Sequence, residues 1–225
     1  RKINKNNPPF IIAELSGNHK GSLVRALKII DKAKEAGASA IKLQTFDLNE
    51  MTINFRSKDF IINDKSSPWY KKNLYQLYKK AQTPRDWHKK IFKYSKKIGI
   101  ICFSSVFDLK SLAFLEKLNA PAYKIASFEN NHFPLIEKVA ATKKPVIIST
   151  GMARIDEIKE IVKIFKLKNN NNFALLKCTS SYPTNPKESN IIAIETLNKK
   201  FRCEVGLSDH TEGIGASVAS IAVGA

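Results

Sequence analysis

The chain has 225 residues, of which 43% are hydrophobic and 26% charged, so it can bury a substantial core and is not a disordered polymer. Its formal charge of +18 would suit an anionic partner, nucleic acid included, but the lysines recur on outer faces of predicted helices, which favours a solvated surface. Three cysteines without CxxC spacing exclude a disulfide framework and a zinc ribbon, and the short apolar runs predict a soluble cytoplasmic protein that does not enter the membrane.

Short apolar segments that end in polar residues recur along the chain, and an amphipathic segment follows each of them. We predict strands at residues 10–15, 40–45, 100–105, 122–127, 145–150, 174–179 and 205–210. The helices between them carry end signals. Ser22 is expected to cap the first helix and Gly37 to end it, while Pro84 takes the first helical position of another helix that Gly99 closes.

Regular strand–helix alternation indicates parallel strands joined by helical crossovers, in an open doubly wound sheet or a closed barrel. No GxGxxG or GxxxxGK[ST] follows a predicted strand, which weakens the nucleotide-binding forms of the open sheet. Polar residues at the end of every strand favour the barrel, whose site is assembled from many strand ends. We therefore expect one domain over residues 1–225, a TIM-type (β/α)8 barrel truncated after strand 7 and helix 7. The opening on Arg1 suggests that both ends are cut.

The polar residues at the strand ends are the candidate site. They are Glu14, Lys42, Gln44, Ser104, Ser105, Lys124, Ser127, Ser149, Thr150, Thr179, Ser180, Ser208, Asp209 and His210. Lys42 and Lys124 stand inside apolar strands, where an unpaired ammonium group is costly, so each requires an anion or must lose its proton. Together with the hydroxyls they predict a phosphate or carboxylate site. Two alternatives stay open: a lysine that pairs with Glu14 and only holds strands together, or a Schiff-base lysine as in barrel aldolases.

Other features carry less information. Residues 46–82 interrupt the repeat, and their aromatic side chains are expected to pack rather than to bind a sugar ring. His88 and His132 are expected to be structural, and Cys178 is expected to be a packing residue.

Six motifs in order resemble the sialic acid synthase family, whose members condense phosphoenolpyruvate with an acetamido sugar. They are FIIAELSGNHKGS, AIKLQT, PAYKIASFE, KKPVIISTGMA, LLKCTSSYPTNP and VGLSDHT. The form of AELSGNH, KIASFE and LLKCTS is similar to the pseudaminic acid synthase branch, which uses 2,4-diacetamido-2,4,6-trideoxy-L-altrose. N-acetylneuraminate and legionaminate synthases, with other acetamido sugars, are the alternatives within the family.

The resemblance implies a role for each matching position. The phosphoenolpyruvate-binding positions match Lys42, Ser105, Lys124, Ser127, Ser149 and Ser208, with Ser180 in place of a frequent asparagine. Gln44 and Tyr182 match sugar-side positions, and Asn18 and His19 in the first loop are further sugar-side candidates. Glu14 matches a glutamate near the reacting carbon, which makes Glu14, Lys42, Lys124 and His210 the catalytic candidates. Lys20 departs from the asparagine that relatives commonly carry.

The resemblance also implies a divalent metal, manganese or else magnesium, with His210 as one ligand. The second histidine ligand and the C-terminal antifreeze-like domain would lie beyond the end of this chain. The whole protein is then expected to be a transferase that forms a C–C bond, acts as a homodimer and binds neither nucleic acid nor membrane.

Overall fold

The computed structural model describes residues 3–4, 7–65 and 67–225, and every strand pair within a unit is parallel. The chain forms two compact units. Ile11–Ala120 is the N-terminal unit, and Pro121–Ala225 with the segment up to Phe10 is the C-terminal unit. Each of the seven predicted strands is present near its predicted position. No helix in the described residues is long and apolar enough to cross a membrane.

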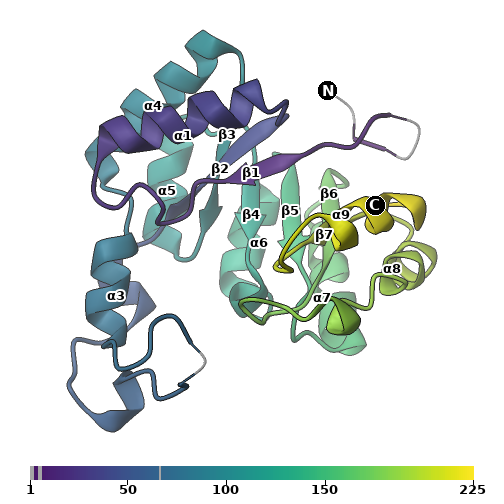
Figure 1. Cartoon of the computed structure of the whole chain (residues 1–225). Helices are drawn as coiled ribbons and strands as arrows, with labels where there is room; N and C mark the ends of the chain where they lie inside the picture. The colour runs from purple at the N-terminus through teal and green to yellow at the C-terminus, as the bar shows by residue number, and fades with distance from the viewer. Residues whose placement is uncertain (1–2, 5–6, 66) are drawn as a thin grey trace. The chain divides into compact units, whose positions relative to one another are not determined.

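The N-terminal unit alternates strands and helices and carries a longer insertion after its second strand (Figure 1). Its elements are β1 (Ile12–Glu14), α1 (Leu23–Glu35), β2 (Ala40–Thr45), α2 (Leu48–Met51), the 3-10 turn η1 (Lys58–Phe60), α3 (Leu74–Ala81), α4 (Arg85–Ile98), β3 (Ile101–Val106) and α5 (Leu109–Lys117). β2 lies between β1 and β3, with Glu14 opposite Lys42 and Gln44 opposite Ser105.

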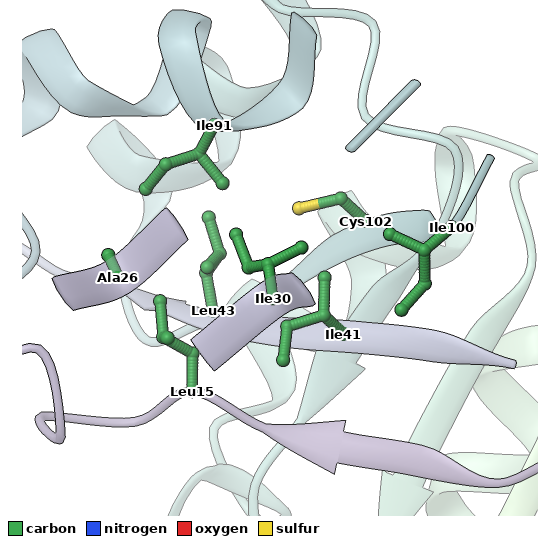
Figure 2. Packing of buried hydrophobic residues seen from close by; sticks show 8 residues of the cluster. All are labelled: Leu15, Ala26, Ile30, Ile41, Leu43, Ile91, Ile100 and Cys102. Carbon is green, nitrogen blue, oxygen red and sulfur yellow. The ribbon is translucent and has the colours of Figure 1, made fainter. Parts of the chain in front are cut away.

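One face of this small sheet is buried beneath α1 and α4 (Figure 1). Because side chains alternate along a strand, Ile41 and Leu43 of β2 point to the same face. Figure 2 shows them directed toward Ile30 of α1 and Ile91 of α4, inside a fully buried cluster. Burial of several aliphatic side chains contributes roughly 1.5–3 kcal/mol each, so this cluster holds α1 and α4 on the strands.

The predicted helix ends are largely confirmed. The Ser22 side chain accepts a hydrogen bond from the Arg25 amide at the start of α1, and Gly37 and Gly99 follow α1 and α4 with φ of 85° and 74°. The helix expected to begin at Pro84 begins instead at Arg85, with Pro84 as its N-cap. Pro84 is extended there, with ψ of 135°, and so lies outside the first turn.

The insertion of residues 46–82 contains α2, η1 and α3. Several of its aromatic rings pack edge to face, with centroids 6.1 Å apart in both Phe46–Tyr78 and Phe55–Phe60. This agrees with the predicted packing role for those rings. Phe55 and Trp69 nevertheless keep 57% and 42% of their surface exposed, so the insertion also presents aromatic surface to solvent.

The C-terminal unit repeats the same alternation over four parallel strands. Its elements are β4 (Tyr123–Ile125), the turn η2 (Ser127–Glu129), α6 (Phe133–Ala141), β5 (Val146–Ser149), α7 (Ile155–Leu167), β6 (Phe173–Cys178), the turn η3 (Pro186–Glu188), α8 (Ala193–Phe201), β7 (Glu204–Ser208) and α9 (Gly215–Ala222). The strands pair in chain order, so their C-terminal ends share one edge. The helix α7 buries Ile158, Ile161, Val162 and Phe165 on its inner side, whereas Ile155 at its start is exposed.

Candidate functional site

In the N-terminal unit, Lys42 contacts polar side chains from the ends of both neighbouring strands. Its ammonium group is 2.8 Å from Glu14 Oε2 and donates a hydrogen bond to Ser105 Oγ, also at 2.8 Å. Lys42 is 6% exposed, and the Glu14 side chain is about half exposed. Three neighbouring strands therefore bring together three of the predicted residues.

The sequence left open that a buried lysine pairs with Glu14 and only holds strands together, and the ion pair bears on that alternative. Lys42 does pair with Glu14, so its charge is compensated within the protein. The pair is at the strand ends and one partner reaches solvent, where an exposed ion pair contributes little to stability. Lys42 also keeps a hydroxyl partner, and a bound anion would share the ammonium group with Glu14.

The sugar-side candidates of this unit differ in position. Gln44 is half-buried on β2, and Asn18 is exposed in the β1–α1 loop, where its carbonyl accepts a hydrogen bond from Arg25 Nε at 2.9 Å. His19 has no exposed surface, lies edge-on to Trp87 and accepts a hydrogen bond from the Gly21 amide through Nδ1. Burial lowers the pKa of His19, and a hydrogen bond to the Ala81 backbone opposes this effect. His19 thus supports the loop from inside.

Lys124 is the corresponding buried ammonium group of the C-terminal unit. It is 6% exposed and donates hydrogen bonds to Ser149 Oγ at 2.5 Å and to the Ile125 carbonyl at 3.2 Å. Lys124 lies on β4 opposite Ile147 of β5, so Ser149 is two residues further along and on the same face. Two of the predicted strand-end residues, Lys124 and Ser149, therefore meet in this unit.

Three further side chains of this unit converge on Gly151, just after β5. A Cβ atom at Gly151 would be 2.4 Å from Ser180 Oγ, 2.8 Å from Ser127 Oγ and 3.2 Å from Cys178 Sγ. Both serine oxygens are buried, and within the described part of the chain neither has an oxygen or nitrogen hydrogen-bond partner. Buried polar groups are normally hydrogen-bonded, so two such hydroxyls suggest a ligand that supplies acceptors.

His210, Tyr182 and Ser208 complete the predicted set. His210 Nδ1 is 2.8 Å from the Thr179 carbonyl oxygen, and the Tyr182 ring lies 4.1 Å from the imidazole centroid to centroid. A carbonyl can only accept, so Nδ1 carries hydrogen and the lone pair of the neutral ring is on Nε2. Ser208 is half-buried at the end of β7, opposite Cys178.

Asp209, between Ser208 and His210, turns toward α9 instead. Its carboxylate accepts hydrogen bonds from Ser217 Oγ at 2.6 Å and from the Thr211 amide at 2.9 Å. Burial raises the pKa of Asp209, but these hydrogen bonds outweigh it and leave the pKa below its usual value. Asp209 therefore fixes the turn that carries His210.

Cys178 is buried, as a packing residue would be, and it also lies close to a histidine. Its Sγ lies 4.0 Å from His210 Nδ1. Burial raises the pKa of Cys178, whereas interactions with His210, Ser127 and Ser208 lower it more strongly, to about 7. The histidine is 32 residues away in sequence, so no local spacing could reveal it.

Glu129 is a candidate residue that the sequence reading missed. It stands in η2, directly after β4, and its Oε2 is buried without a hydrogen-bond partner among the described residues. Burial raises the pKa of Glu129 to about 7, and attraction to Lys124 partly opposes the shift. The signal available in sequence was its place in KIASFE, five residues after Lys124.

Lys177 is a third lysine at a strand end. Its ammonium group donates hydrogen bonds to the Cys178 carbonyl and to Thr179 Oγ1, both at 2.9 Å. Burial lowers the pKa of Lys177. Lys177 and Cys178 are adjacent on β6 and so point to opposite faces, which directs Lys177 away from the Gly151 cluster.

Comparison with known proteins defines the class to which this fold and these strand ends belong. Residues 29–225 match the model of the NeuB family, and the chain belongs to that family. The chain is 48% identical over 223 residues to the pseudaminic acid synthase of Campylobacter jejuni and 42% identical over 218 residues to that of Helicobacter pylori. These alignments cover 99% and 97% of this chain and 64% of each relative, so the chain spans less than two thirds of the length of these curated relatives.

A solved structure of a sialic acid synthetase also matches this chain. The N-acetylneuraminic acid synthetase of Leptospira borgpetersenii, in complex with citrate, matches with a TM-score of 0.86 at 36% identity. The match covers 98% of this chain and 71% of that one. The predicted fold class, a parallel α/β chain of the barrel type, is confirmed by this likeness together with the strand order within each unit.

Proposed function

We propose that the protein containing this chain condenses phosphoenolpyruvate with 2,4-diacetamido-2,4,6-trideoxy-L-altrose and water, giving a nonulosonic acid and phosphate. One observation carries the proposal: Lys124 is buried against Ser149, and in the same unit the buried hydroxyls of Ser127 and Ser180 have no oxygen or nitrogen hydrogen-bond partner among the described residues. An ammonium group with neutral donors suits an anionic oxygen group. Membership of the NeuB family and 48% identity to a pseudaminic acid synthase support the choice of reaction.

In this proposal the lysines and hydroxyls bind phosphoenolpyruvate. Lys124 supplies charge and Ser149, Ser127, Ser180 and Ser208 supply hydrogen bonds within the C-terminal unit. Lys42 and Ser105 are already hydrogen-bonded to each other at 2.8 Å and would present one ammonium proton and one hydroxyl to an anionic oxygen. That both lysines serve the same ligand remains a prediction from the sequence.

The chemistry proposed for the bound reactants balances without a redox step. Carbon C3 of phosphoenolpyruvate attacks the aldehyde carbon of the open-chain sugar, and the new C–C bond leaves positive charge at C2. Water adds at C2 and loses a proton, and the former aldehyde oxygen takes up a proton to become a hydroxyl. Phosphate then leaves with cleavage of its C–O bond, while the C2 hydroxyl loses its proton and becomes the keto group. Holding the anionic groups fixed orients C3 toward the carbonyl, which is a proximity effect.

Two carboxyl groups are candidates for moving the proton of the attacking water. Glu14 pairs with Lys42 and is half exposed, so it suits a base or an orienting group. Glu129, with a pKa of about 7, exists in both protonation states near neutral pH and suits a group that takes up and returns a proton. The two residues belong to different units. The proposal therefore gives Glu14 the role of a base or orienting group and Glu129 the role of a group that takes up and returns a proton.

A divalent metal, manganese or else magnesium, is proposed with His210 as one ligand. The fit rests on the hydrogen bond from Nδ1 to the Thr179 carbonyl, which orients the ring and leaves the lone pair on Nε2, as in many histidine ligands. Within residues 3–4, 7–65 and 67–225, no group of three or more His, Cys, Asp or Glu side chains is arranged to hold an ion, so further ligands would come from elsewhere. When bound, the ion would polarise the aldehyde oxygen as a Lewis acid.

The sugar is proposed from the relatives, with Gln44, Tyr182 and Asn18 as sugar-side residues. His19, also a sugar-side candidate from the sequence, is buried and would act only by supporting the loop that carries Asn18. The N-acetylneuraminate and legionaminate syntheses stay as alternatives with the same chemistry and another acetamido sugar. A homodimer in the cytoplasm is part of the same proposal.

The test uses the full-length protein with phosphoenolpyruvate that carries ¹⁸O in the bridging oxygen. Cleavage of the C–O bond predicts labelled inorganic phosphate, formed only when the acetamido sugar is present. Label that stays in the organic product, or phosphate release without sugar, would refute the proposal. Running the altrose derivative beside N-acetylmannosamine and the legionaminate precursor distinguishes the three sugars.

A Schiff-base aldolase is tested in the same preparation. Borohydride reduction with the carbonyl substrate would attach the substrate covalently to a lysine in an aldolase, and mass spectrometry would locate it. The synthase mechanism predicts no adduct at Lys42, Lys124 or Lys177. An adduct at any of them would replace the proposed mechanism.

A further inference from the structure

The strands β2 and β3 present two different sets of polar residues at their C-terminal ends. Lys42 and Ser105 meet on one face, where Glu14 joins them. Thr45 and Ser104 are on the opposite face, the face that carries Ile41, Leu43 and Cys102 into the cluster beneath α1 and α4 (Figure 2). Ser104 was grouped with Ser105 in the sequence, but the two point in opposite directions.

A hydrogen-bond chain runs from α4 to Ser104 of β3, whose hydroxyl also lies beside the Ser105 carbonyl oxygen. His88 Nε2 is 2.8 Å from Thr45 Oγ1, Thr45 Oγ1 is 2.7 Å from Ser104 Oγ, and Ser104 Oγ is 2.9 Å from the Ser105 carbonyl oxygen. His88 and Ser104 have no exposed surface and Thr45 is 1% exposed. Water cannot replace any of these partners without rearrangement of the core.

The chemistry of the partners fixes the direction of the chain. His88 Nδ1 lies 3.0 Å from the Pro84 carbonyl oxygen, which can only accept, so Nδ1 carries the hydrogen. Nε2 of the neutral ring then accepts from Thr45, and Thr45 accepts from Ser104. Ser104 has a single hydrogen, so Thr45 Oγ1 and the Ser105 carbonyl oxygen compete for it. Burial lowers the pKa of His88, and the neighbouring Arg85 acts in the same direction, which supports the neutral ring. The Phe114 ring of α5 packs edge-on against the imidazole at 5.1 Å.

We propose that His88 is a positioning residue for the Lys42–Ser105 pair, acting through Thr45 and Ser104. This rests on the proposed function, in which Lys42 and Ser105 bind phosphoenolpyruvate. His88 contacts neither of them: it ties the last residue of β2 to α4, and Thr45 in turn ties β2 to Ser104, the residue before Ser105. The face of β2 and β3 that packs beneath α1 and α4 is thereby fixed, while the opposite face carries Lys42 and Ser105.

The test compares three variants of the full-length protein. Thr45→Val keeps the shape of the side chain and removes the hydroxyl that joins His88 to Ser104. Thr45→Ser keeps the hydroxyl and removes a methyl group. Ile41→Val shortens a buried side chain on the same strand and the same face without touching the hydrogen-bond chain, so it controls for general loss of stability.

Calorimetry with phosphoenolpyruvate gives the affinity, and thermal unfolding gives the stability. Small displacements of a binding group have large effects on a site, so we expect Thr45→Val to weaken binding by about threefold to tenfold. Thr45→Ser should bind within about twofold of the parent, and Ile41→Val should lower the melting temperature without weakening binding. Unchanged affinity in Thr45→Val, or an equal loss in Ile41→Val, would overturn the positioning role.

A second measurement separates this proposal from the proposed function. If the parent protein binds no phosphoenolpyruvate, the proposed function fails, and amide hydrogen exchange at Ser104–Val106 then decides the positioning role alone. Faster exchange there in Thr45→Val, restored in Thr45→Ser, supports the role. Exchange that matches the parent in all three variants refutes it.

Discussion

Lys124 is a buried ammonium group held against the hydroxyl of Ser149 and the carbonyl of Ile125. Lys124→Met keeps the length of the aliphatic chain and removes the charge, so the fold should persist. We expect phosphoenolpyruvate affinity to fall by at least about 100-fold in calorimetry, because charge-assisted hydrogen bonds are lost. Lys28→Met, at an exposed position on α1, makes the same change in net charge and should bind normally. Undiminished binding by Lys124→Met would contradict the assignment.

Gly151 is placed where a side chain does not fit. In Gly151→Ala the new Cβ would be 2.4 Å from Ser180 Oγ and 2.8 Å from Ser127 Oγ, so both hydroxyls must turn away. We expect roughly tenfold weaker phosphoenolpyruvate binding and a loss of about 1–3 kcal/mol in unfolding free energy.

The matched control is Gly215→Ala at the start of α9, where an added Cβ meets nothing within 4 Å. Alanine favours the helix there, so this variant should be neutral or stabilised by up to about 1 kcal/mol. Calorimetry and denaturant unfolding measure both variants. Equal behaviour of the two would show that the convergence at Gly151 has no role in binding.

Glu129 should make stability depend on pH. Burial raises its pKa from 4.5 to about 7, so between these values the folded protein holds a proton that the unfolded chain has lost. The unfolding free energy therefore falls as pH rises through this window, by up to about 3 kcal/mol. Glu129→Gln, which is neutral at every pH, should flatten the profile and exceed the parent in stability at pH 8.

Urea unfolding between pH 4.5 and pH 8 measures this slope. Glu137→Gln on α6, where the carboxyl group is about half exposed, is the control and should keep the slope of the parent protein. A slope that survives in Glu129→Gln would assign the pH dependence to another group.

At the scale of elements, one carboxylate connects two helix starts. Asp108, 5% exposed, is the N-cap of α5 and accepts from the Ser111 amide at 2.6 Å, while its other oxygen accepts from the Asp47 amide at 2.9 Å. Asp47 is itself the N-cap of α2. Asp108 thus ties the start of the insertion to the loop after β3.

We expect Asp108→Ala to lower the unfolding free energy by about 2–4 kcal/mol, because it removes a cap and leaves buried donors without a partner. Asp47→Ala removes one cap bond at a half-buried position and should lose about 1 kcal/mol or less. Chemical denaturation compares them. If the two losses are equal, the link between the two helix starts does not contribute.

The elements themselves were largely predictable because their signals are local. Short apolar segments that end in polar residues located all seven strands, and Ser22, Gly37 and Gly99 marked helix ends through capping chemistry. The start of α4 was placed one residue early because proline is accepted at both the cap and the first helical position. The glutamate in η2 was overlooked because nothing local distinguishes a buried carboxyl group from an exposed one.

At the scale of the whole molecule, the charge of +18 is spread over helix surfaces. Lysines pair with glutamates of their own helix in α1, α7 and α8: Lys32 with Glu35, Lys163 with Glu160 and Lys199 with Glu195. Such exposed pairs contribute little to stability, and they are what a solvated lysine surface looks like. The two lysines that matter for the proposed chemistry are instead the buried ones.

The sequence by itself determined the alternation of parallel strands and helices and the presence of lysines and hydroxyls at strand ends, since both depend on residues near one another in the chain. Only the tertiary structure decided what those groups meet. Lys42 reaches Ser105 across 63 residues, and Ser127 and Ser180 converge on Gly151 from separate segments that follow β4 and β6. It also set the pKa values of Glu129 and Cys178, because burial and distant neighbours, rather than residue type, govern the energy of a charge inside a protein.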